Sequence, residues 1–92
     1  MVRIYFYSRL SEIVGKKELK LKTENLLDLL KILHQRYGQQ LGQELFSGGD
    51  IKKVNPAYTI VINDRPVDLQ NMKKIKLKNH DSLHFIPPIV GG

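Results

Sequence analysis

The two glycines that end the sequence, Gly91 and Gly92, are the residues whose type and position most directly suggest chemistry. Pro87 and Pro88 precede them and hold the chain extended, because the proline ring fixes φ. The last six residues carry no charged side chain and span up to about 20 Å when fully extended. Because glycine lets another backbone or a reactive group approach closely, such a tail fits a narrow channel. Its terminal carboxylate acylates poorly until it is activated, so this chemistry implies a partner enzyme that uses ATP.

The other residue types that carry chemistry form no recognisable set. His80 and His84 are four residues apart, which in a strand separates them by about 13 Å, too far to share a metal. His34 stands alone in a predicted helix, and Asp64 with Asp68 is interpreted as a pair of turn and cap residues. The absence of cysteine excludes disulfides, thiolate metal sites and a cysteine nucleophile. We therefore predict no self-contained active site, no metal site and no bound cofactor.

Length and composition describe one small globular domain. The chain has 92 residues, which are too few to form two separate hydrophobic cores. Of these residues 41% are hydrophobic and 26% are charged, a composition too apolar for a disordered chain. No apolar run approaches about 18 residues, and an alternating pattern begins at Val2, so neither a membrane span nor a signal peptide is expected. A cytoplasmic location is the expectation. The net charge of +6 keeps nucleic acid and acidic protein surfaces open as partners.

The positioning elements follow from hydrophobic periodicity. Alternation of apolar residues predicts four strands, at residues 2–8, 17–22, 58–63 and 82–86. Residues 58–63 are apolar enough for a central strand, and a brief strand is expected at residues 67–69. Alternation of lysine with Ile75 and Leu77 predicts a basic edge strand over residues 73–78.

One main helix is predicted between the second and third strands. Thr23 or Asn25 can cap it and Gly38 can stop it. An apolar stripe at helical spacing consists of Leu26, Leu29, Leu30, Leu33 and Tyr37. Residues 39–46 form a second, shorter helix in this interpretation.

The order of the elements favours an α+β fold in two layers, with the helix on one face of a mixed sheet of four to five strands. A hairpin, a crossing helix and later strands that pair beside the first strand make the β-grasp arrangement. We therefore predict a domain over residues 1–86 and an extended tail over residues 87–92 that ends in the two glycines.

The whole chain resembles the ubiquitin-like sulfur carriers of the MoaD/ThiS type. Residues 4–12, followed by Val14 and Gly15, resemble the opening strand and loop of the molybdopterin-synthase small subunit, and residues 85–92 resemble its terminal motif. Leu83 and His84 also lie at the same distance from the final glycines as a Leu-His pair in ubiquitin. The double proline favours the molybdopterin type over the thiamine type.

The resemblance implies that the carboxylate of Gly92 is the working group. A ubiquitin-activating-type enzyme would adenylate it with ATP, and a sulfur donor would displace AMP to leave a thiocarboxylate. The tail would then enter the large subunit of molybdopterin synthase and pass its sulfur to a pterin, building the group that holds molybdenum or tungsten. Gly91 would give the fit in the channel. The residues implied to dock onto partners are Phe85, Ile86, Pro87, Pro88, Ile89 and Val90.

Two other functions stay open on the sequence. The same activated glycine could be joined to a lysine of a target protein, which would make the chain a protein modifier. A basic β-grasp module for nucleic acid is the third reading, and it is disfavoured because no base-reading motif accompanies the lysines. The basic surface is explained either by solvation or by complementarity to an acidic partner.

Overall fold

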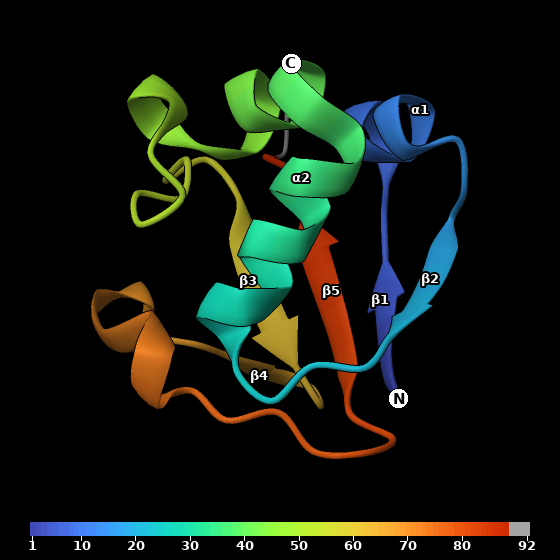
Figure 1. The fold of residues 1–92 in the computed structure, drawn as a ribbon, viewed down its shortest axis with the longest axis vertical. Helices are drawn as coiled ribbons and strands as arrows, with labels where there is room; N and C mark the ends of the chain where they lie inside the picture. The colour runs from blue at the N-terminus through green and yellow to red at the C-terminus, as the bar shows by residue number, and fades with distance from the viewer. Residues whose placement is uncertain (89–92) are drawn as a thin grey trace.

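A computed structural model describes residues 1–88, with Asn71 described by its backbone alone. Figure 1 shows a main helix laid across one face of a sheet. The strands and helices, in chain order, are β1 (Val2–Tyr5), α1 (Ser8–Val14), β2 (Glu18–Leu21), α2 (Leu26–Leu45), η1 (Ser47–Gly49), β3 (Thr59–Ile62), β4 (Arg65–Pro66), η2 (Leu69–Lys74) and β5 (Ser82–Ile86).

The sheet has five strands in the order β2-β1-β5-β3-β4. β1 runs antiparallel to β2 and parallel to β5, while β3 is antiparallel to both β5 and β4. The α+β prediction of a mixed sheet with one main helix is therefore confirmed. The prediction of a central strand at residues 58–63 is wrong in position, because β5 occupies the centre and β3 lies one strand from the edge.

Helix α2 covers the sheet with the face that its leucines define. The Asn25 side chain caps its first turn by accepting a hydrogen bond from the Asp28 backbone at 2.8 Å. Leu26, Leu29 and Leu30 are fully buried, as the periodicity predicts. The predicted stop at Gly38 is confirmed as a break inside α2, because its φ of 70° and ψ of −149° are non-helical, a conformation that glycine adopts readily and other residues avoid, and two helical segments meet there at a kink. The predicted second helix is thus the C-terminal part of α2.

The core lies between the sheet and the helices, and alternation along the strands determines which residues enter it. Val2, Ile4 and Phe6 are buried from the first strand and its extension, and Leu83 and Phe85 from β5. Strands of alternating sequence bury one face in this way because successive side chains point to opposite sides of the sheet.

Two local predictions need correction. Residues 73–78 are not an edge strand, since η2 ends at Lys74 and the next residues run extended along the start of α2, with an isolated bridge between Asn25 and Lys76. The lysine alternation is real nevertheless, because Leu77 is buried there while Lys76 is exposed. The short strand expected at residues 67–69 lies instead at Arg65–Pro66.

Among residues 1–88, no helix combines the length and the apolar character that crossing a bilayer requires.

Candidate functional site

The predicted tail leaves the domain at the end of the central strand. Ile86 is the last residue of β5 and pairs with Thr59 of β3. Pro87 is half-buried and Pro88 is exposed, so the chain leaves the sheet into solvent within two residues. The remaining predicted site residues lie outside the described part of the chain: Ile89, Val90, Gly91 and Gly92.

Two successive side chains at the end of β5, Phe85 and Ile86, point to opposite faces of the sheet. Phe85 is 0% exposed and stacks on Phe6, with 5.9 Å between ring centroids. Ile86 is 36% exposed and is one of the few large apolar side chains on the described surface. Phe85 therefore anchors the tail within the core, and the surface of the predicted docking strip begins at Ile86.

A cluster of aromatic rings and one histidine lies beside Ile86 on the sheet face that turns away from the core. His84 stacks on Tyr5 with centroids 4.6 Å apart, and its Nδ1 lies 2.5 Å from the Tyr7 hydroxyl. The parallel register brings Tyr5 opposite His84. The sequence patterns did not predict the contacts of His84 with Tyr5 and Tyr7. The two-residue spacing of His84 and Ile86 does indicate that these two side chains lie on the same face of a strand.

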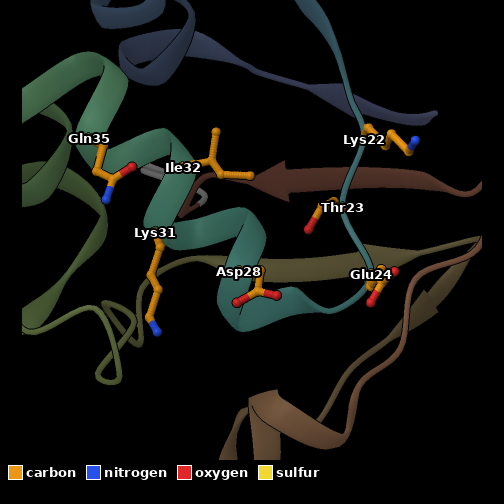
Figure 2. Close-up of a pocket in the computed structure, with 7 residues that line it drawn as sticks. All are labelled: Lys22, Thr23, Glu24, Asp28, Lys31, Ile32 and Gln35. Carbon is orange, nitrogen blue, oxygen red and sulfur yellow. The ribbon is translucent and has the colours of Figure 1, made fainter.

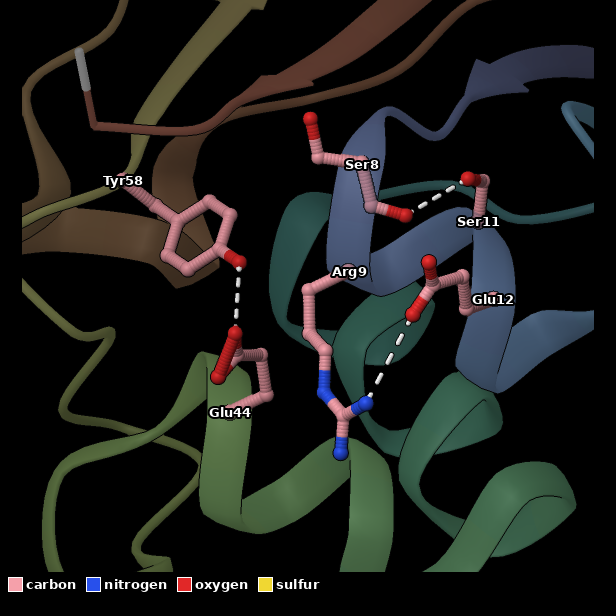
Figure 3. Close-up of polar contacts among 6 residues, drawn as sticks. All are labelled: Ser8, Arg9, Ser11, Glu12, Glu44 and Tyr58. Atoms are coloured by element: carbon pink, nitrogen blue, oxygen red, sulfur yellow. Dashed lines mark hydrogen bonds and ion pairs between the residues drawn. The ribbon is translucent and has the colours of Figure 1, made fainter. Parts of the chain in front are cut away.

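Figure 3 shows polar contacts among side chains of α1, the C-terminal part of α2 and Tyr58, the residue before β3. The Tyr58 hydroxyl donates to Glu44 Oε1 at 3.2 Å, joining the residue before β3 to the C-terminal part of α2. Arg9 Nη1 lies 3.5 Å from Glu12 Oε2 in an exposed ion pair. Burial, with the nearby Glu44 carboxylate, raises the pKa of Tyr58 from 10.0 to about 12.

This pKa gives a prediction for alkaline stability. The folded chain holds the Tyr58 proton up to about pH 12, whereas the unfolded chain releases it near pH 10. The contribution of Tyr58 to the free energy of unfolding is therefore complete below pH 10 and decreases as the pH rises from 10 to about 12. Denaturant unfolding of the natural chain and of Tyr58→Phe, compared across this range, measures the effect. As the pH rises, the free energy of unfolding of the natural chain is expected to fall more than that of Tyr58→Phe.

The Glu44→Gln variant is the control, since it removes the charge and keeps a side-chain acceptor. It is expected to reduce this pH dependence without abolishing it, because burial is the larger cause of the shift. If the natural chain and Tyr58→Phe lose the same free energy of unfolding between pH 10 and 12, the loss does not come from the Tyr58 hydroxyl.

The surface hollow in Figure 2 offers no catalytic arrangement. It has a volume of about 500 Å³ and lies between the connection from β2 and the exposed side of α2. Its lining mixes lysines with carboxylates, and the Thr23 hydroxyl already donates to the Asn25 carbonyl at 3.2 Å. Within residues 1–88, no three His, Cys, Asp or Glu side chains gather as metal ligands would. The arrangement of the described residues is that of a domain that presents a chain end.

Comparison with known proteins agrees with this arrangement. The ThiS family model matches residues 4–92. No curated protein matches the chain by sequence.

Several solved structures share the fold. The small archaeal modifier protein 1 from Methanosarcina acetivorans is 28% identical, with a TM-score of 0.77 over 99% of this chain and 95% of that one. A chain of the Amycolatopsis orientalis BexX/CysO complex is 19% identical, with a TM-score of 0.82 over 100% of both. A putative molybdopterin converting factor subunit 1 from Pyrococcus furiosus is 21% identical, with a TM-score of 0.71 over 96% and 97%. The predicted β-grasp fold is confirmed.

Proposed function

The chain belongs to the ThiS family, whose model matches residues 4–92, and from this premise we propose that it is a sulfur carrier that works through the carboxylate of Gly92. The observation that carries the proposal is the extent of the family match, which runs through the predicted tail as well as the folded domain. The exposed exit of the chain at Pro88 supports it, because a partner can reach a tail that leaves the sheet into solvent.

The chemistry proceeds in two steps on one carbon atom. A carboxylate oxygen of Gly92 attacks the α-phosphorus of ATP in the partner enzyme, which forms an acyl adenylate and releases pyrophosphate. A sulfur nucleophile from a donor then adds to the carbonyl carbon and expels AMP. Where that nucleophile is a persulfide, a thiol attacks the donor's sulfur in the resulting acyl disulfide, forms a disulfide with it and releases the thiocarboxylate. No cysteine of the carrier takes part, in agreement with a sequence that has none.

The destination that we propose for the sulfur is molybdopterin. The tail enters the large subunit of the synthase and transfers sulfur to a pterin precursor, and water then adds to the Gly92 carbonyl carbon so that the carrier returns with a free carboxylate. Similarity to the putative molybdopterin converting factor subunit 1 and the double proline at Pro87 and Pro88 support this destination. Ile86 and the two prolines provide the described part of the docking surface.

Mass spectrometry of the intact chain tests the proposal. After incubation with the host's adenylating enzyme, ATP and a sulfur donor, we expect a mass increase equal to the exchange of one oxygen for one sulfur, located in the C-terminal peptide. The reaction without ATP is the control. An unchanged mass with an enzyme that is active on another carrier overturns the proposal.

A second candidate function is protein modification, which the 28% identity to a small archaeal modifier protein favours. In that role the activated Gly92 carbonyl is attacked by a target lysine, which expels the activating group and forms an isopeptide bond. Purification of the tagged chain from its host separates the two roles, because trypsin, whose last cleavage site is after Lys78, leaves residues 79–92 attached to target lysines only after conjugation.

A further inference from the structure

Three exposed lysines lie near the start of β5, at the end of the molecule away from Ile86 and Pro87. The extended segment after η2 crosses the foot of the sheet before β5 begins (Figure 1). The tail leaves from the other end of β5, which at five residues is about 16 Å long. Lys73, Lys76 and Lys78, here called the lysine edge, line a groove of about 320 Å³ together with Leu77 and Asn25.

The charge of the lysine edge is not neutralised within the described residues. Glu24 is the one carboxylate that lines the groove. Within residues 1–88, the Arg9–Glu12 contact is the one ion pair, so the three ammonium groups lack a carboxylate within 4 Å. All three side chains are exposed. The groove therefore presents an excess of positive charge to whatever approaches it.

The backbone of the same segment offers an open edge. The Leu26 N–H donates to the Ile75 carbonyl at 2.9 Å, and the Leu77 N–H donates to the Glu24 carbonyl at 2.8 Å. These two bonds flank Lys76, so its own N–H and C=O point away from this pairing. Neither group has a backbone partner among the described residues. An extended chain could pair with Lys76 on this side.

These features together indicate one kind of ligand. We propose that the lysine edge binds an acidic, extended peptide segment of a partner protein. Lys76 and Lys78 are alternate residues, which in extended chains are about 6.7 Å apart, and carboxylates on alternate residues of a peptide have the same spacing. No aromatic side chain lines the groove to stack on bases, which favours a peptide over nucleic acid.

Such a site is a second binding site for a partner protein, separate from the tail. A partner bound at the lysine edge leaves Ile86 and Pro87 uncovered, since they lie at the other end of β5. The carrier can then be held by one protein while its tail is in the active site of another. This inference does not depend on the chemistry at Gly92.

A titration of the isotope-labelled full-length chain, followed by NMR, tests peptide binding at the lysine edge. The probe is an eight-residue peptide of alternating threonine and glutamate, and the comparison peptide has the same residues in two blocks. We expect shift changes at residues 24–26 and 73–78, slower exchange of the Lys76 amide proton, and weaker binding of the block peptide. Shift changes spread evenly over all lysines, or equal binding of both peptides, overturn the proposal.

Matched variants separate the site from the net charge. Lys73→Gln, Lys76→Gln and Lys78→Gln together are expected to weaken binding of the alternating peptide about tenfold, because the three charge pairs are lost. Lys16→Gln, Lys17→Gln and Lys53→Gln remove the same charge from exposed positions elsewhere and are expected to weaken it less than about twofold. Equal losses overturn the proposal, as does tighter binding of an eight-nucleotide single-stranded RNA than of the peptide.

Discussion

A chain that lacks Gly92 is expected to form no detectable thiocarboxylate, with adenylation slowed at least about 100-fold. Removal of one residue withdraws the carboxylate by about 3.3 Å, and a misplacement of about 1 Å already costs this much in a positioned reaction. Adenylation is measured by exchange of labelled pyrophosphate into ATP. A rate close to that of the natural chain contradicts the proposed function.

The complementary variant adds one alanine after Gly92. Its carboxylate lies too far along the channel and its Cβ takes space that glycine leaves open, so it is expected to lose activity as completely as the shortened chain. Both variants leave the described core unchanged, and their free energies of unfolding should equal that of the natural chain. An inactive variant of reduced stability does not count in favour of the role of Gly92.

The largest expected loss of stability is that of Phe85→Ala, about 3–5 kcal/mol in the free energy of unfolding. Phe85 is fully buried in the central strand and stacks on Phe6, so its removal leaves a cavity between β5 and the extension of β1. For a small domain this is a large part of the total stability. Urea unfolding followed by circular dichroism measures the change.

Ile86→Ala is the matched control, one residue along the same strand. Ile86 points to solvent, so a change of about 1 kcal/mol or less is expected, while the KM for the chain in adenylation should rise because apolar surface next to the tail is lost. A loss of stability as large as that of Phe85→Ala contradicts the division of roles between the two side chains.

The sequence patterns predicted which residues face inward better than they predicted which strands pair. Ile75 and Leu77 do point toward the protein and the lysines between them do point out, yet this segment pairs with Asn25 and not with the sheet. Alternation of apolar and polar residues predicts which side chains of an extended segment are buried. Which segment pairs with it is determined by contacts between residues far apart in the chain.

The centre of the sheet was misassigned for the same reason. Residues 60–62 are three consecutive β-branched apolar residues, but Val61 and Ile62 are only half-buried in β3. β5 reaches the centre because it pairs in parallel with β1, at a separation of nearly the whole chain, which no local pattern encodes. The Tyr7–His84 contact depends on that register and could not be predicted without it.

The position of β5 has a consequence for synthesis of the protein. β1, β2 and α2 leave the ribosome first, but the strand that joins β1 to β3 is made after all other described elements. A chain interrupted before Ser82 lacks both the middle of its sheet and the residues that follow it. The complete sheet therefore forms only after residues 82–86 have been translated, and the tail leaves the domain from the end of this same strand.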